Sequence, residues 1–211
     1  MSGTPAVYLV DDDAAVRDGL ALLLDTAGLE VLAYDSAATF LAAYAPGRGG
    51  CLILDVRMPD VSGPELQAEL FRRGIDLPII FLTGHGDIPT TVQAMKLGAM
   101  DFLTKPVQGA ELLERVHAAL GKSARQQEQA AVVQSLRERV QDLTPRELQI
   151  MVLIAAGRPN KEIARRLGIS HRTVEIHRAR VLQKTGAANP VELSRIVEIC
   201  GVAAELPTEP D

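Results

Sequence analysis

Short apolar runs alternate with longer amphipathic segments over the first 120 residues. Runs of this kind are typical of buried strands, and the chain has five, each of four to five residues: Ala6–Val10, Leu29–Ala33, Cys51–Leu54, Ile79–Leu82 and Met100–Leu103. The segments between and after them have helical spacing, which predicts helices over Ala14–Ala27, Ala37–Tyr44, Ser62–Arg73, Pro89–Gly98 and Gly109–Gly121. Strict alternation of strands and helices predicts an α/β fold, a parallel sheet with helices on both faces.

A different pattern begins after residue 121. Residues 122–142 are polar and contain neither Gly nor Pro, so they predict a helical linker rather than a flexible one. An apolar stripe runs along this linker, at Val133, Leu136, Val140 and Leu143. The stripe has two interpretations: a short coiled-coil seam, or a helix packed on its own neighbour, which the length of barely two heptads favours.

The remaining residues predict a small all-α domain of four helices, over 145–156, 160–167, 171–185 and 190–200. The sequence Thr144-Pro145-Arg146-Glu147 is a capping box with Pro at the first helical position. Asn160 and Ser170 are candidate caps for the second and third helices. The predicted organisation is a domain over 1–121, a linker over 122–142, a four-helix domain over 143–202 and a disordered tail over 203–211.

Charge separates the two halves of the chain. The net charge of −5 over 211 residues argues, taken alone, against a nucleic-acid partner. Residues 1–120 carry 8 basic and 16 acidic side chains, however, whereas residues 121–211 carry 14 and 11. Eight basic residues against two acidic ones lie between Arg158 and Lys184, which makes that segment a basic patch.

Composition excludes several classes of protein. A content of 47% hydrophobic and 23% charged residues is typical of a folded, soluble protein. No apolar run approaches the roughly 18 residues of a membrane span, and the first residues lack a signal-peptide pattern, so a cytoplasmic protein without a membrane partner is expected. Cys51 and Cys200 stand alone in apolar settings, which predicts packing roles rather than a disulfide or a zinc site.

Side chains that could bind a metal ion or take part in a reaction follow the predicted strands. Asp11 and Asp12 follow the first strand, Asp55 the third, Thr83 the fourth and Lys105 the fifth. Open α/β sheets bind ligands at these strand ends, beside the point where strand order reverses, so Asp11, Asp12 and Asp55 are expected to converge. Because close carboxylates repel one another and oxygen ligands suit hard cations, the group predicts a Mg²⁺ site. Asp55 could then attack a phosphoryl group, with Lys105 balancing charge and Thr83 donating a hydrogen bond.

Four sequence blocks carry these residues in order: Val10-Asp11-Asp12-Asp13, Leu54-Asp55-Val56-Arg57-Met58-Pro59, Leu82-Thr83-Gly84-His85-Gly86-Asp87 and Phe102-Leu103-Thr104-Lys105-Pro106. Within the first block, Asp13 is expected only to cap the following helix. Together the blocks resemble the receiver domain of two-component response regulators, over residues 5–120. The resemblance implies a flavodoxin-like fold with strand order 2-1-3-4-5, for which the receiver is a standard example.

The resemblance also implies a role for each residue. Asp55 would be the phospho-acceptor, Asp12 a direct Mg²⁺ ligand, Asp11 a ligand mainly through water, and Arg57 a ligand through its backbone carbonyl. Thr83 and Lys105 would contact the phosphoryl oxygens. The resemblance further implies that Phe102 turns inward as Thr83 moves toward the phosphate, and that the Lys105-Pro106 bond is cis.

The basic patch predicts a helix-turn-helix, whose longer helix would enter the major groove of DNA; the alternative is a solvated basic face on a helical bundle. The blocks Leu143-Thr144-Pro145-Arg146-Glu147, Asn160-Lys161-Glu162-Ile163-Ala164 and Thr173-Val174-Glu175-Ile176-His177 resemble the LuxR/NarL-type DNA-binding domain, over about 143–200. The whole chain most resembles FixJ-like regulators. Candidate DNA contacts are Asn160, Lys161, Arg172, Thr173, Glu175, Ile176, His177, Arg178, Arg180 and Lys184. His177 could equally pack between helices, and Glu175 could accept from cytosine or repel phosphate.

The sequence therefore predicts a phosphorylation-activated transcription factor. A histidine kinase would phosphorylate Asp55, and the chain would dimerise and bind double-stranded promoter DNA, with RNA polymerase as a further candidate partner. It would catalyse only its own phosphoryl transfer and dephosphorylation. Two rival functions remain open: a Mg²⁺-dependent phosphohydrolase, which lacks a placed general acid, and a phosphorelay receiver whose second domain binds a protein.

Overall fold

The structure is a computed structural model, and it describes residues 4–84 and 95–202. It divides into two compact units, Met1–Gln127 and Glu128–Asp211. The motif residues 85–87, most of the helix predicted over Pro89–Gly98 and the tail predicted over 203–211 lie outside the described residues.

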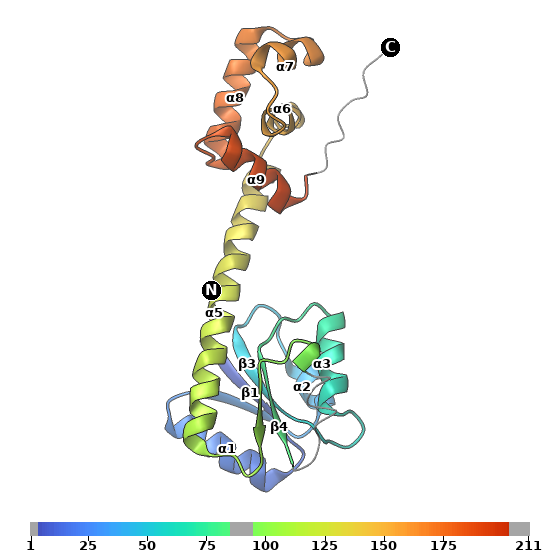
Figure 1. Cartoon of the computed structure of the whole chain (residues 1–211), viewed down its shortest axis with the longest axis vertical. Coiled ribbons are helices and arrows are strands. Elements are labelled where there is room, and N and C mark those ends of the chain that lie inside the picture. The colour runs from blue at the N-terminus through green and yellow to red at the C-terminus, as the bar shows by residue number, and fades with distance from the viewer. Residues whose placement is uncertain (1–3, 85–94, 203–211) are drawn as a thin grey trace. The chain divides into compact units, whose positions relative to one another are not determined.

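A five-stranded parallel sheet forms the centre of the first unit (Figure 1). Its order is β2-β1-β3-β4-β5, which confirms the predicted order and fold class. The strands are β1 (Ala6–Val10), β2 (Glu30–Tyr34), β3 (Gly50–Asp55), β4 (Ile79–Thr83) and β5 (Asp101–Thr104). The strand order reverses between β1 and β3, which pair in register from Ala6 with Gly50 to Val10 with Leu54. The carboxyl ends of β1 and β3 are therefore neighbours.

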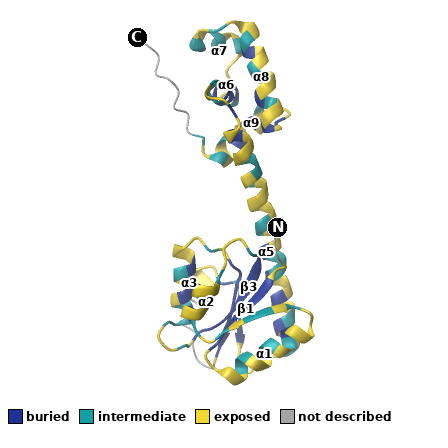
Figure 2. Ribbon diagram, turned by 180° about the vertical axis from the view of Figure 1, so that it is seen from behind, coloured by how far each residue is buried: buried dark blue, intermediate teal, exposed yellow. Residues whose placement is uncertain are grey.

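Helices cover both faces of this sheet, because alternate strand residues enter two separate cores. Tyr8 packs on one face with residues of α2 (Ala37–Ala43) and α3 (Gly63–Arg72). Leu9 packs on the other face with residues of α1 (Ala14–Thr26) and α5, which begins at Gly109. Figure 2 shows β1 and β3 as buried strands. The runs predicted as buried strands are buried in β1, β3 and β4, whereas the edge strands β2 and β5 are only partly buried.

Helix α5 runs without interruption over Gly109–Gln141, so the predicted helix end at Gly121 is wrong. An interior Gly costs a helix only about 1 kcal/mol relative to Ala, and tertiary contacts continue past it. The buried hydroxyl of Ser123 accepts a hydrogen bond from the Gly50 amide at 3.0 Å. Gln127 donates to the carbonyl of Gly47 at 3.2 Å. The first turns of the predicted linker thus pack against the first unit.

The apolar stripe of the linker belongs mainly to the core of the second unit. Leu136, Val140 and Leu143 pack with buried residues of the helices that follow. Of the two interpretations of the stripe, the structure confirms packing on the chain's own neighbouring helices for these three residues.

Over its described residues, the second unit contains four helices after α5, at the predicted positions: α6 (Pro145–Ala155), α7 (Asn160–Leu167), α8 (His171–Thr185) and α9 (Pro190–Cys200). The capping box of Thr144 and Glu147 begins α6, and Ser170 caps α8, both as predicted. The predicted cap at Asn160 is wrong. The N-cap of α7 is Pro159, whose carbonyl accepts from the amides of Glu162 and Ile163, and Asn160 is already helical.

No helix in the described ranges is both long enough and apolar enough to cross a membrane. Cys51 is buried, and burial raises the pKa of its thiol to about 12. This agrees with the packing role predicted for Cys51.

Candidate metal centre and nucleic-acid interface

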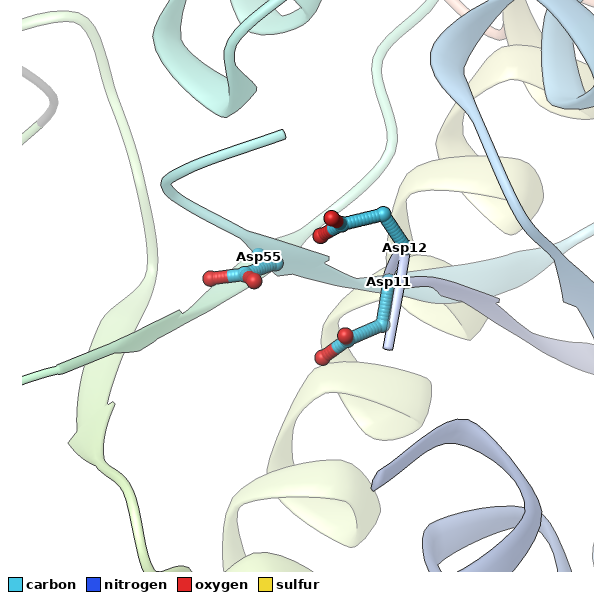
Figure 3. A group of neighbouring side chains, drawn as sticks. All are labelled: Asp11, Asp12 and Asp55. Carbon is cyan, nitrogen blue, oxygen red and sulfur yellow. The ribbon is translucent and has the colours of Figure 1, made fainter. Parts of the chain in front are cut away.

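Three carboxylates meet at the carboxyl ends of β1 and β3, as predicted. Asp11 directly follows β1, Asp12 comes next, and Asp55 is the last residue of β3. One ligand oxygen from each lies within 4.8 Å of the other two. Figure 3 shows their carboxyl groups pointing to the same side of the strand ends. Asp11 and Asp55 are buried whereas Asp12 is exposed, so the cluster is open on one side.

Lys105 joins two of these carboxylates. Its Nζ donates to Asp11 Oδ2 at 2.7 Å and to Asp55 Oδ2 at 2.8 Å. Burial raises the pKa of Asp11, although the Lys105 ammonium opposes the shift. Burial also disfavours the charged form of Lys105, but the hydrogen bonds to Asp11 and Asp55 outweigh it and raise its pKa. Lys105 is followed by a cis bond to Pro106, as the resemblance implied.

The donor set fits a hard divalent cation. Carboxylate oxygens are the ligands that such cations prefer, and one ammonium group cannot neutralise the charge of three ionised carboxylates. Asp11, Asp12 and Asp55 could therefore bind a metal ion. The backbone amide of Arg57 donates to Asp55 Oδ1 at 3.4 Å. A metal contact through the Arg57 carbonyl stays a prediction.

The two predicted switch residues lie on β4 and β5, the strands that follow β3 on the side away from β1. Thr83 ends β4, is buried, and donates its hydroxyl to the carbonyl of Gly84 at 3.0 Å. Phe102 lies on β5 and stacks on Phe81, with ring centroids 4.9 Å apart. Their movement on phosphorylation stays a prediction.

Arg17 is a residue of this site that was not predicted. Its guanidinium Nη1 donates to the backbone carbonyl of Asp11 at 2.7 Å. The sequence signal is slight: Arg17 lies four residues after Asp13, which caps α1 through its side chain. Sequence alone does not say toward which backbone group such an arginine turns.

In the second unit, α7 and α8 form a helix-turn-helix. Ile163, Val174 and Val181 are buried in its core, as predicted for residues that hold the helices together. Other α8 residues face solvent: the Arg172 side chain is 84% exposed, and Ile176 remains 44% exposed. This exposed part of α8 presents a surface suitable for DNA.

Several predicted DNA contacts have partners inside the unit. Arg178 donates to Asn160 Oδ1 at 3.1 Å, which joins α8 to the start of α7. Glu175 lies 3.8 Å from Arg172 and so offsets part of the basic charge. His177 is half-buried, in agreement with either of its two interpretations.

The remaining predicted contacts differ in accessibility. Lys161 and Arg180 are exposed and Thr173 is half-buried. Lys184 donates to the buried Glu147 carboxylate at 2.7 Å and to the Asp142 carbonyl at 3.1 Å. Lys184 therefore holds α8 against the start of α6, a role that the sequence did not predict, and its contact with DNA stays a prediction.

We expect Lys184→Met to lower the free energy of unfolding of the second unit by about 1–2 kcal/mol at pH 7. The hydrogen bond from Lys184 is the main cause that lowers the pKa of Glu147 from 4.5 to about 2. A lowered pKa stabilises the fold above the unfolded value and loses this effect as pH falls toward the folded value. The difference between wild type and variant should thus shrink below pH 4.5. Urea unfolding at several pH values measures it.

Arg180→Met is the matched control, because it removes an exposed basic side chain from the same helix. It should leave the unfolding midpoint nearly unchanged. A Lys184→Met variant as stable as wild type at pH 7, or a difference independent of pH, would contradict the role given to Lys184.

Comparison with protein families gives two matches. Residues 7–117 match the family model described as response regulator receiver domain. Residues 141–197 match the model described as bacterial regulatory proteins, luxR family. The two matches occupy the first unit and most of the second, and they leave out the middle of α5.

Two relatives are similar over most of the chain. The transcriptional regulatory protein FixJ of Azorhizobium caulinodans is 48% identical over 197 residues, which are 93% of each chain. The response regulator protein TodT of Pseudomonas putida is 42% identical over 192 residues, 91% of this chain and 85% of TodT.

Solved structures are similar as well. The response regulator StyR has a TM-score of 0.81 at 43% identity, covering 93% of this chain and 99% of StyR. Full-length FixJ from B. japonicum has a TM-score of 0.57 at 41% identity, covering 96% of this chain and all of the other.

Proposed function

Because the chain belongs to the response regulators that join a receiver domain to a luxR-family DNA-binding domain, we propose that phosphorylation of Asp55 by a histidine kinase controls its binding to promoter DNA. The observation that carries this proposal is the bridge from Lys105 Nζ to Asp11 and Asp55, within a cluster that Asp12 completes. It combines a nucleophilic carboxylate, a cation site and a fixed positive charge at the end of one sheet.

Each residue of the cluster has its own role in phosphoryl transfer. An oxygen of Asp55 attacks the phosphorus of a phosphohistidine, the P–N bond breaks, and the histidine leaves as the acyl phosphate forms. Mg²⁺, when bound by Asp11, Asp12, Asp55 and the Arg57 carbonyl, supplies positive charge to the phosphoryl oxygens. Lys105 exchanges its bond with the Asp55 carboxylate for a phosphoryl oxygen.

Phosphorylation then changes the conformation of residues at the β5 edge of the sheet. Thr83 turns its hydroxyl from the Gly84 carbonyl to the phosphoryl group, and Phe102 moves inward into the space beside it. β5 is an edge strand, and Met95 and Lys96, a few residues before it in the sequence, are exposed, which supports a dimer surface at this edge.

The dimer presents two α8 helices to paired half-sites in promoter DNA. Exposed basic residues such as Lys161, Arg172 and Arg180 contact phosphates, and exposed Ile176 faces the bases. At a promoter the bound dimer lies beside RNA polymerase, which is the further partner we propose. These tasks require a cytoplasmic protein.

Sedimentation velocity of the full chain tests the mechanism. We expect a monomer with Mg²⁺ alone and a dimer when beryllofluoride, a phosphoryl mimic, is added. The beryllofluoride-treated protein should also retain duplexes from a random-sequence DNA pool, with binding that weakens as salt rises. Monomers in both states would contradict activation by dimerisation, and salt-independent or absent DNA binding would contradict the DNA interface.

We also propose that the chain transfers phosphoryl groups only to and from its own Asp55. In this proposal Lys105 binds Asp11 and Asp55 and Asp12 binds the metal ion, so none of these cluster residues is assigned as a proton donor to an external leaving group. Steady turnover of p-nitrophenyl phosphate by wild type, absent from Asp55→Asn, would favour the phosphohydrolase instead.

A further inference from the structure

Arg17 fixes the backbone from which the metal ligands project. It belongs to α1, and its guanidinium reaches back to the Asp11 carbonyl at 2.7 Å. Other groups hold the rest of Asp11: its amide donates to the Tyr34 carbonyl at 3.2 Å, and its carboxylate binds Lys105 Nζ. Among the described contacts, only the guanidinium of Arg17 binds the Asp11 carbonyl.

The carbonyl of Asp11 shares one rigid peptide plane with the amide of Asp12. Holding that carbonyl therefore sets the direction in which Asp12 leaves the strand end. Asp12 is exposed, so packing does little to orient its side chain. A charge-assisted hydrogen bond is about twice as strong as a neutral one, which makes Arg17 a firm anchor for this plane.

We propose that Arg17 is a positioning residue for divalent metal binding: by anchoring the Asp11 carbonyl, it holds the carboxylate of Asp12 in reach of a cation shared with Asp11 and Asp55. This inference rests on the proposed function, in which the cluster binds Mg²⁺. The proposal predicts the direction in which Arg17 changes the affinity for Mg²⁺. A guanidinium near the site repels a cation, so a purely electrostatic Arg17 would weaken metal binding, whereas a positioning Arg17 strengthens it.

Calorimetric titration of the full, unphosphorylated chain with Mg²⁺ distinguishes these roles. Arg17→Met removes the charge and the donors but keeps a side chain of similar length. We expect it to bind Mg²⁺ about ten-fold more weakly, because loss of a group that orients a metal ligand typically costs roughly 10- to 100-fold in affinity. Arg73→Met is the matched control, since it removes an exposed arginine at the end of α3, and should bind as wild type.

Equal or tighter Mg²⁺ binding by Arg17→Met would overturn the proposal. Urea unfolding without metal checks that the variant is folded. If Arg17→Met does not fold, Arg17→Leu, which also lacks a hydrogen-bond donor, takes its place in the same titration, with the same supporting and overturning results. Absence of Mg²⁺ binding by wild type would overturn the metal site of the proposed function itself, and the wild-type titration therefore separates the two failures.

Discussion

Asp55→Asn is expected to abolish phosphorylation by acetyl phosphate while leaving the fold intact. The amide matches the carboxylate in shape but lacks the negative oxygen that attacks phosphorus. Lys105 keeps its bond to the buried Asp11 at 2.7 Å, so the variant retains one of the two ion pairs at the cluster. A phosphate-affinity gel measures the fraction of phosphorylated chain over time.

Asp13→Asn is the matched control. Asp13 is also an aspartate beside the cluster, but its side chain accepts the amides of Ala15 and Val16 as the cap of α1. Asn caps helices about as well as Asp, so this variant should be phosphorylated at the wild-type rate. Phosphorylation of Asp55→Asn at a comparable rate would show that another residue accepts the phosphoryl group.

The sheet and the acidic cluster could be predicted because each rests on a short-range pattern. A short apolar run such as Ile79–Leu82 favours a buried strand, and the structure places β4 at Ile79–Thr83. Once the strands are parallel and β1 pairs with β3, residues that follow them must meet at one edge. The meeting of Asp11 and Asp55 therefore follows from their positions in the sequence.

The errors lie where a distant contact overrides a local preference. Gly121 is a good helix stop by itself, but the hydrogen bonds of Ser123 with Gly50, the first residue of β3, and of Gln127 with Gly47, in the loop before β3, favour continuation of α5. Asn160 is a good cap by itself, but its side chain instead accepts from Arg178, eighteen residues later in the sequence. No spacing rule contains these contacts.

The same limit applies to the roles of charged side chains. Lys184 has the sequence context of a DNA contact, yet the structure bonds it to Glu147, 37 residues earlier. Arg17 has the context of a solvated helix residue, yet it binds the backbone of Asp11. Sequence shows that a charge is present, and only the folded backbone shows which group it meets.

Gly63 shows how closely the fold and the site are joined. It is the first residue of α3, and its amide donates to the Val56 carbonyl at 3.0 Å. A Cβ at this position would lie 2.4 Å from the Asp55 carbonyl oxygen and 2.8 Å from a ring carbon of Phe81. Both distances are below van der Waals contact, and the nearer atom belongs to the backbone. Only glycine lets α3 begin this close to Asp55.

Gly63→Ala is therefore expected to lower the free energy of unfolding of the first unit by about 1–3 kcal/mol, as overpacking does, and to slow phosphorylation of Asp55.

Gly19→Ala is the matched control, and it should change the free energy of unfolding in the opposite direction. Gly19 lies inside α1, and a methyl group added there would meet no atom within 4 Å beyond its own helix backbone, so Ala should stabilise the helix by about 0.5–1 kcal/mol. Urea unfolding and the phosphate-affinity gel measure both variants. We expect slower phosphorylation of Gly63→Ala because the added methyl group displaces the backbone of Asp55. A Gly63→Ala variant that unfolds at or above the wild-type urea midpoint and is phosphorylated at the wild-type rate would contradict this prediction.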